Sequence, residues 1–159
     1  MNVRPAEPSD LDALAALWHD VWQVSHAALL PEELRKFRTL ESFRDRIEHL
    51  LKDTRVIGPV GAPIGFCTIK GDELYQMYVS SAAQGTGAAA LLMADGEARL
   101  KTNGVATTWL SCAIGNERAM RFYEKLGWRR VGVMSNPADT SAGPFPLETW
   151  RYEKDLSTE

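Results

Sequence analysis

The chain has 159 residues, of which 45% are hydrophobic and 25% charged, and its formal net charge is −3 at pH 7. These values predict one globular domain over residues 1–159 with a sizeable core, and they argue against a disordered or membrane chain. The acidic balance argues against a nucleic-acid partner, since duplex binding needs clustered lysine and arginine. We recognise neither a signal peptide nor an apolar run long enough to span a membrane, so we expect a cytoplasmic protein.

The first elements predicted are a short strand and an amphipathic helix. Val3-Arg4 has strand character and is ended by Pro5. Ser9-Asp10-Leu11-Asp12 fits a capping box, and apolar residues then recur at helical spacing as far as Trp22.

A second helical pattern follows a break at Pro31. Its apolar residues lie between Leu40 and Leu51, which predicts another amphipathic helix. The charged residues from Arg44 to Glu48 indicate a solvated face.

From Thr54 onward the pattern changes to strands. Three are predicted, at residues 55–60, 63–70 and 73–79, and a meander is their simplest arrangement. Pro59 favours an edge or a bulge for the first of them, because proline cannot donate a hydrogen bond to an inner ladder.

A glycine-rich turn separates the strand ending at Val79 from a helix predicted over residues 88–102. Free N–H groups at a helix N-terminus favour anions such as phosphate, and Gly85 and Gly87 let a ligand approach the backbone closely. A P-loop is excluded because no lysine follows the glycines. The dinucleotide pattern G-x-G-x-x-A fits from Gly85, but it expects the glycines directly after the strand and an acidic residue about 20 residues later, and both are missing.

The last part of the chain predicts strands at 105–113, 128–133 and 147–156, a helix at 117–126 and a long loop at 135–146. Because a helix joins them, the strands at 73–79 and 105–113 should be parallel neighbours. Cys67 and Cys112 fall in strand-like runs and are expected to be buried thiols. The three histidines do not combine with them at the spacing of metal ligands, so we expect no metal site.

Two segments of this chain resemble the GNAT-type acyl-CoA N-acyltransferases. Gln84-Gly85-Thr86-Gly87-Ala88-Ala89 is similar to the Q-x-x-G-x-A pyrophosphate loop of that family. Residues 116–128 are similar to its N-x-x-A-x-x-F-Y-x-x-x-G-F segment, with Trp128 in place of the usual phenylalanine. The resemblance implies a single α/β (α+β) domain with a mixed, mostly antiparallel sheet of about six to seven strands, flanked by about four helices.

The resemblance also implies acetyl-CoA as co-substrate, no metal, and transfer of the acetyl group to an amine. The cofactor contacts that it implies are Met77, Tyr78, Val79, Gln84, Gly85, Thr86, Gly87, Ala88, Ala89, Asn116 and Tyr123. Tyr123 is expected to protonate the departing thiolate. The spacing agrees without the family, because Asn116 and Tyr123 lie two helical turns, roughly 10 Å, apart on nearly one face. A plain N-cap and a rim aromatic are the alternatives for these two residues.

Glu73 is the candidate general base, because it stands four residues before Met77, where the histone-type acetyltransferases of the superfamily carry their glutamate. The ribosomal-protein N-terminal acetyltransferases place theirs on the next strand, where this chain has Ser111. The alternative for Glu73 is an ordinary carboxylate at the start of a strand.

The acceptor pocket is the least determined part. Trp18, Trp22 and His26 recur every four residues, so Trp22 and His26 are candidate substrate contacts, and the loop at 135–146 is a second candidate wall. The tryptophans could equally belong to the core and His26 to the surface. Polyamine, antibiotic, amino acid and protein N-terminus all remain open as acceptors, the acidic chain mildly favours cationic amines, and a homodimer is allowed. A catalytically silent acyl-CoA-binding domain and, less favoured, a dinucleotide-binding domain are the alternatives to an enzyme.

Overall fold

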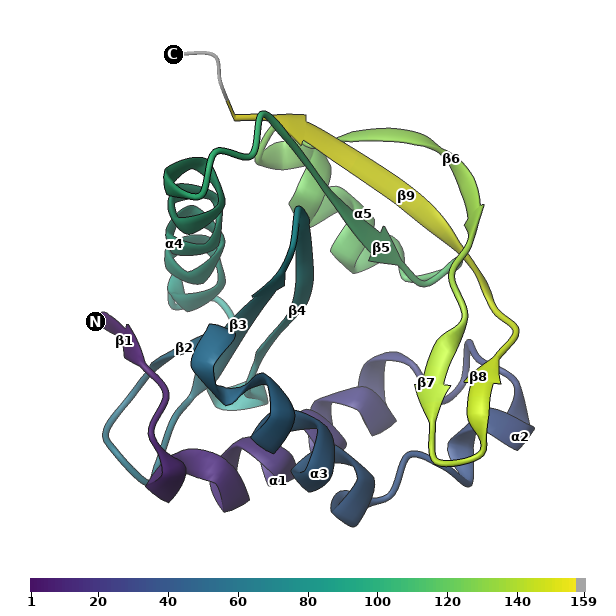
Figure 1. Cartoon of the computed structure of the whole chain (residues 1–159), viewed down its shortest axis with the longest axis horizontal. Coiled ribbons are helices and arrows are strands. Elements are labelled where there is room, and N and C mark those ends of the chain that lie inside the picture. Colours follow the sequence, from purple (N-terminus) through teal and green to yellow (C-terminus); the bar gives the residue numbers. More distant parts are fainter. Residues whose placement is uncertain (157–159) are drawn as a thin grey trace.

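A seven-stranded sheet forms the centre of the molecule in a computed structural model that describes residues 1–156 (Figure 1). The strand order is β1-β2-β3-β4-β5-β9-β6, and β4 and β5 are the one parallel pair of neighbours in this sheet. The strands are β1 (Val3–Pro5), β2 (Thr54–Ile57), β3 (Gly65–Lys70), β4 (Glu73–Val79), β5 (Thr107–Cys112), β6 (Arg129–Ser135) and β9 (Glu148–Asp155). The predicted α/β fold is confirmed, as are the meander of β2, β3 and β4 and the parallel crossover to β5.

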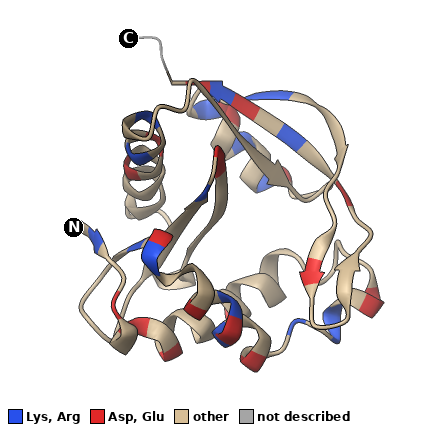
Figure 2. Cartoon of the chain, in the orientation of Figure 1, with Lys and Arg blue, Asp and Glu red and all other residues tan. Residues whose placement is uncertain are grey.

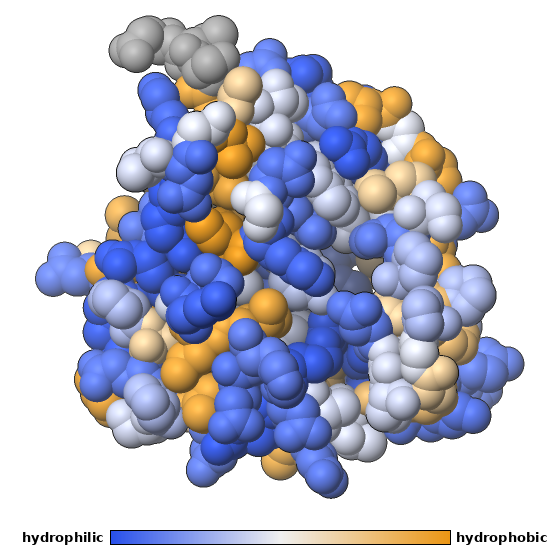
Figure 3. Space-filling model, in the orientation of Figure 1, coloured by the Kyte–Doolittle hydropathy of each residue, from blue (hydrophilic) through white to orange (hydrophobic). Residues whose placement is uncertain are grey.

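Helices cover both faces of the sheet and create two separate cores. The helices are α1 (Leu11–Ser25), α2 (Glu32–Arg35), α3 (Leu40–Leu50), α4 (Ala88–Thr102) and α5 (Glu117–Lys125). Alternation along β3 shows the division: Phe66 packs with α1 and α3, whereas its neighbour Cys67 packs with α4. Acidic and basic residues both occur along α3 and α4 (Figure 2), and hydrophilic residues cover much of the surface shown in Figure 3.

The loop predicted at 135–146 contains a hairpin that the sequence pattern did not predict. Strands β7 (Ala138–Thr140) and β8 (Gly143–Phe145) pair with each other as a separate two-stranded sheet beside the helices. The four-residue helix α2 was not predicted either. Both elements are too short for a periodic pattern, so contacts with the rest of the chain decide them.

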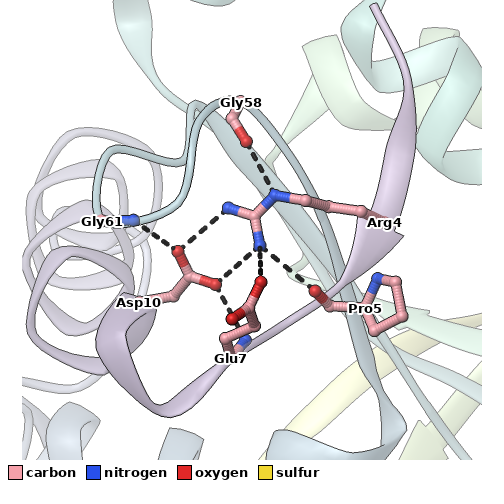
Figure 4. Close-up of polar contacts among 6 residues, drawn as sticks. All are labelled: Arg4, Pro5, Glu7, Asp10, Gly58 and Gly61. Atoms are coloured by element: carbon pink, nitrogen blue, oxygen red, sulfur yellow. Dashed lines mark hydrogen bonds and ion pairs between the residues drawn. The ribbon is translucent and has the colours of Figure 1, made fainter.

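The predicted capping box at Ser9–Asp12 is wrong. Asp10 instead accepts from the N–H of Glu7 at 2.8 Å and pairs with Arg4, with Nη1–Oδ2 at 2.8 Å and Nη2–Oδ1 at 3.0 Å (Figure 4). The N–H of Gly61 also donates to Asp10 at 2.8 Å. Because these donors stabilise the carboxylate, chiefly the Arg4 hydrogen bonds, the pKa of this fully buried Asp10 falls to about 2. The network joins β1 and the turn after β2 to the start of α1.

The strand expected at 55–60 ends earlier, at Ile57. Gly58 has a φ of 113°, which residues with a side chain rarely adopt, so the chain turns before Pro59 and the proline stays outside the sheet. Cys67 and Cys112 are buried and form no disulfide, as predicted. In the part of the chain that the structure describes, no group of three or more histidine, cysteine, aspartate or glutamate side chains could hold a metal. No helix within residues 1–156 has the length and apolar character needed to cross a membrane.

Candidate active site

The glycine turn lies at the N-terminus of α4 with its backbone exposed. Gly85 and Gly87 have φ of 79° and 90°, and Gly87 is the N-cap of the helix. No heavy atom lies within 4 Å of the position that a Cβ would take at either glycine, so a ligand can approach both. Within residues 1–156 the N–H groups of Gly85, Gly87 and Ala89 have no acceptor. The turn therefore presents unpaired donors at the positive end of a helix dipole, a combination that suits a phosphate group.

The other residues of the turn hold its shape. The hydroxyl of Thr86 donates to the carbonyl oxygen of Ala83 and accepts from the N–H of Ala88 at 3.4 Å. Gln84 is exposed and Ala88 is fully buried. Thr86 and Ala88 thus use their polar groups within the turn, and Gln84 remains open to solvent.

Strands β4 and β5 diverge as they approach this turn (Figure 1). Their ladder consists of a single residue pair, Glu73 with Trp109, at the start of β4. Farther along, the N–H of Ser80 donates to Ile64 on the β3 side at 2.8 Å. Because strand N–H groups point alternately to the two sides, those of Met77 and Val79 are directed toward the widening gap beside β5.

A β-bulge at Tyr75 decides which face Glu73 occupies. Gln76 pairs with Thr68 and Leu74 pairs with Ile69, so Tyr75 is an extra residue on β4. Met77 and Val79 pack in the α4 core, and strict alternation would place Glu73 on that same face. The bulge moves Glu73 to the opposite face, where it lines a cavity with Tyr75, Gln76 and Tyr78.

That cavity has a volume of about 240 Å³ and is bordered by α1, the segment from α2 to α3, β4 and the hairpin β7-β8. A hollow bordered by hydrophilic residues is visible near the middle of the face in Figure 3. Trp22 and His26 both line the cavity, and so do residues 136–139 of the predicted second wall. Trp18 and Trp22 are also buried in the α1 core, so they belong to the core and to the cavity wall at once.

His26 is half-buried and electrically neutral near pH 7. Its ring stacks on Trp22, with centroids 6.3 Å apart and planes at 9°, and its Nδ1 lies 2.6 Å from the hydroxyl oxygen of Ser25. Burial lowers the pKa of His26 to about 4. The expectation of an ordinary surface histidine is therefore wrong, because the imidazole packs between Trp22 and Tyr78.

Glu73 is 8% exposed, and its environment raises its pKa to about 7. Burial is the main cause, Lys70 opposes it and Asp72 reinforces it. A carboxyl group that titrates near 7 inside a cavity has the properties of a general base at neutral pH.

Tyr123 lies on the other side of β4, in the α4 core. Its ring contacts Tyr152 at 5.7 Å and Trp128 at 6.5 Å between centroids. Burial raises its pKa further above that of a free phenol, with smaller contributions from Cys112 and Tyr78, so the hydroxyl keeps its proton. The hydroxyl makes no hydrogen bond within residues 1–156. Tyr78 lines the cavity and also contributes to the pKa of Tyr123.

Asn116 is the N-cap of α5. Its side-chain oxygen accepts from the N–H of Ala119 at 3.3 Å, which is the arrangement of a plain cap. Because the side-chain oxygen is used by this cap, the side chain can contact a cofactor only through its NH2 group.

Several residues that line the cavity were missed by the sequence analysis, above all Arg38 and Arg46. Arg46 was assigned to the solvated face of its helix, and that assignment is wrong. It lies three residues after Phe43 and one before Ile47, at the border of the apolar stripe, and its side chain reaches over Trp18. The sequence around Arg38 carries no comparable signal.

A glycine turn at a helix N-terminus, a pair of diverging parallel strands and a cavity with a perturbed carboxylate together fit the class of acyl-group transferases. The sequence profile described as "Acetyltransferase (GNAT) family" matches residues 11–128, more than half of the chain. The chain therefore belongs to the GNAT family, and the protein is an acetyltransferase.

Known proteins agree in sequence and in fold. An uncharacterised N-acetyltransferase of Mycobacterium tuberculosis is 31% identical over 135 residues, which cover 79% of this chain and 86% of the relative. The crystal structure of an N-acetyltransferase from Staphylococcus aureus Mu50 superposes with a TM-score of 0.74 at 21% identity and covers 98% of both chains. The PaiA N-acetyltransferase from Thermoplasma acidophilum, in complex with coenzyme A, superposes with a TM-score of 0.65 at 20% identity and covers 97% of this chain and 98% of its own.

Proposed function

We propose that the protein transfers an acetyl group from acetyl-CoA to the amine of a small acceptor by direct attack. The observation that carries the proposal is the bulge at Tyr75, which directs Glu73 into the cavity while Met77 and Val79 stay on the side of the diverging strands. One strand thereby faces a donor on one side and an acceptor on the other.

The residues present fit coenzyme A. The unpaired N–H groups of Gly85, Gly87 and Ala89 suit the pyrophosphate, and the N–H groups of Met77 and Val79 suit the pantetheine arm. The bound co-substrate supplies the acetyl group as a thioester. One strand N–H group polarises the thioester carbonyl as an oxyanion-hole donor. This N–H group is held in place for the developing negative charge on the carbonyl oxygen because β4 pairs with β3.

Glu73 and Tyr123 divide the proton transfers. Glu73 takes a proton from the ammonium of the acceptor, which must be neutral to attack a carbonyl carbon. A carboxylate with a pKa of about 7 is a strong enough base to assist and is still mostly ionised above that pH. As the carbon–nitrogen bond forms and the carbon–sulfur bond breaks, Tyr123 gives its hydroxyl proton to the leaving sulfur. A raised phenol pKa ensures that this proton is present at the start. The surplus proton on the newly acylated nitrogen returns to the Tyr123 oxygen, and Glu73 releases its proton to solvent.

Two measurements test the proposal. Acetyl-CoA at 100 times its dissociation constant should stabilise the protein by about 2.7 kcal/mol, seen as a rise in melting temperature, whereas NAD should give no rise. Release of free thiol from acetyl-CoA should then depend on an added amine, in a panel that spans amino acids, polyamines, aminoglycosides and peptide N-termini. An unchanged melting temperature at saturating acetyl-CoA would rule out the donor, and thiol release independent of every amine would rule out the acceptor chemistry.

A further inference from the structure

The cavity wall opposite β4 carries two arginines for which the acetyl-transfer chemistry has no use. Arg38, between α2 and α3, is 6% exposed, and its Nη1 donates to the carbonyl oxygen of Asp139 at 2.7 Å. Arg46, on α3, lies over the ring of Trp18 at 4.3 Å and donates from Nη2 to the hydroxyl of Tyr75 at 3.3 Å. Both line the cavity.

Neither arginine has an acidic partner within residues 1–156. Arg44, on the outer side of the same helix, pairs with Asp12 at 2.8 Å and Glu48 at 3.6 Å, whereas no carboxylate oxygen lies within 4.0 Å of Arg38 or Arg46. The carboxylate of Asp139 is bound elsewhere, by the hydroxyl of Tyr75 at 3.2 Å. Burial, and next the charge of Arg46, lower the pKa of Arg38 to about 10, so it remains a cation at neutral pH. Asp139 opposes this lowering of the Arg38 pKa only as a minor contribution. A buried cation with no carboxylate in direct contact is incompletely compensated, which makes this wall a place where an anion gains affinity.

Two further polar groups of the cavity lining lack partners. The indole N–H of Trp18 and the hydroxyl of Thr149 are both buried and have no hydrogen-bond partner among the described residues. Burial raises the pKa of Tyr78 to about 12, and the nearby Trp18 N–H opposes this rise, but the indole N–H and the Tyr78 hydroxyl do not meet hydrogen-bond geometry. An indole N–H can only donate, so it needs an oxygen or another acceptor.

The size and the remaining lining of the cavity restrict the class of ligand that it can bind. A volume of about 240 Å³ is below the usual range for drug-sized ligands and fits a molecule of amino-acid size. Its apolar lining includes Trp22, Leu30, Leu34 and Leu147, and Lys70 adds a third positive charge. The lining also holds the carboxyl groups of Glu73 and Asp139, so its three cations face two acidic groups. Polyamines and aminoglycosides, which carry several positive charges, are disfavoured beside this net positive lining.

We propose that the acceptor is a small amine that also carries a carboxylate, as an amino acid does, with the carboxylate held by Arg38 and Arg46 and the amine facing Glu73. This inference rests on the proposed function, because it takes the cavity as the acceptor site. Arginine forks match a carboxylate geometrically, and charge-assisted hydrogen bonds are about twice as strong as those between neutral groups.

Three matched acceptors test it: L-phenylalanine, L-phenylalaninamide and 2-phenylethylamine, with thiol release from acetyl-CoA as the readout. The carboxylate-bearing amine should have a kcat/KM about tenfold or more above the other two, the range that a charge-assisted hydrogen bond supplies. The variant Arg46→Gln, which keeps hydrogen-bonding capacity but loses the charge, should reduce this preference to about twofold, mainly by raising KM. The control Arg44→Gln, on the same helix but outside the cavity, should retain the full preference.

A binding measurement keeps the inference testable if phenylalanine itself is a poor substrate. N-acetyl-L-phenylalanine should change the tryptophan fluorescence on titration because Trp18 and Trp22 line the cavity, and its amide should bind about tenfold more weakly. The difference should vanish in Arg46→Gln and persist in Arg44→Gln. Equal binding of acid and amide, or a turnover preference for spermidine or an aminoglycoside, would overturn the inference. If acetyl-CoA still raises the melting temperature, that failure concerns the acceptor class alone; if it does not, the proposed function fails with it.

Discussion

The glycine turn and the cavity beside Glu73 are built in opposite ways. The turn is one contiguous hexapeptide, Gln84 to Ala89, which offers a ligand the unpaired backbone N–H groups of Gly85, Gly87 and Ala89. The cavity is formed by side chains from α1, the α2–α3 segment, β4, β5 and the hairpin, a set that spans more than a hundred residues of the chain. A turn of this kind depends on two positive φ angles, whereas the cavity depends on how five segments pack.

This difference indicates which residues can be substituted without loss of the fold and which cannot. Any acyl-CoA carries the same pyrophosphate handle, so a backbone cradle needs only glycine and a helix end. Acceptors differ in charge and size, and cavity side chains such as Arg46 can change without disturbing the sheet. Substitutions in the two regions should therefore affect different kinetic constants, and four of them test this, from the largest expected effect to the smallest.

Glu73→Gln should lower kcat/KM about 1,000-fold at neutral pH, within the range typical of general acid–base catalysis. The loss is the largest because an ammonium group cannot attack until it is deprotonated. Wild-type activity should rise with pH through about 7, the pKa of Glu73, and the variant should lack this rise. A variant that retains the pH dependence would assign the base to another group.

Glu73→Gln should lower activity but raise the stability of the folded protein at alkaline pH. The folded carboxyl holds its proton up to about pH 7, whereas in the unfolded chain it loses it near 4.5, so the contribution of this group to stability falls as the pH rises between these values. Glu73→Gln should remove this fall and raise the free energy of unfolding at pH 8 by up to about 3 kcal/mol. Urea unfolding of both proteins at pH 4.5 and pH 8 measures it, and an equal difference at the two pH values would contradict burial as the cause.

Tyr123→Phe should lower kcat about 100-fold, at the lower end of acid–base effects. A thiolate has a pKa near 8.5 and can leave without full protonation, so the loss is smaller than that at Glu73. The acetyl-CoA dissociation constant should change less than about twofold, because the phenyl ring that packs in the core is retained and the hydroxyl forms no hydrogen bond within residues 1–156. An equal loss of binding and turnover would make Tyr123 a cofactor contact.

Gly87→Val should weaken acetyl-CoA binding about tenfold and leave the KM of the acceptor unchanged. Gly87 caps α4 at a φ of 90°, a conformation that costs of order 1–3 kcal/mol for a residue with a side chain. Calorimetric titration with coenzyme A gives the affinity. Gly104→Val is the matched control, since Gly104 has a φ of 87° at the far end of α4 and should lose stability but not affinity.

His26→Gln should have the smallest effect, a rise in acceptor KM of about threefold from the lost stacking on Trp22, which is worth roughly 0.5–1.5 kcal/mol. The rise of activity through pH 7 should remain, because the pKa of His26 is about 4 and the residue is already neutral there. Loss of that rise would identify His26, and not Glu73, as the titrating group. Turnover from pH 5.5 to 9 distinguishes the two.

The sequence by itself determined the family, the parallel crossover and the glycine turn at the start of α4. The reason is that glycines at a strand-to-helix junction, and an asparagine seven residues before a tyrosine, act through local backbone and helical geometry. Cys67 and Cys112 followed from the same kind of local pattern, since each lies in an apolar strand.

Only the tertiary structure decided the acceptor side. A bulge at Tyr75 changes which face of β4 carries Glu73, and nothing in the local sequence marks that extra residue. The hairpin β7-β8 is too short to predict, yet it brings Asp139 to Arg38 across 101 positions of the chain. The sequence pattern assigned Arg46 to the solvated face of its helix. In the folded protein its side chain contacts Trp18 on α1 and Tyr75 on β4. Burial is a property of the packed molecule, and burial is what makes these arginines and Glu73 chemically different from their neighbours in sequence.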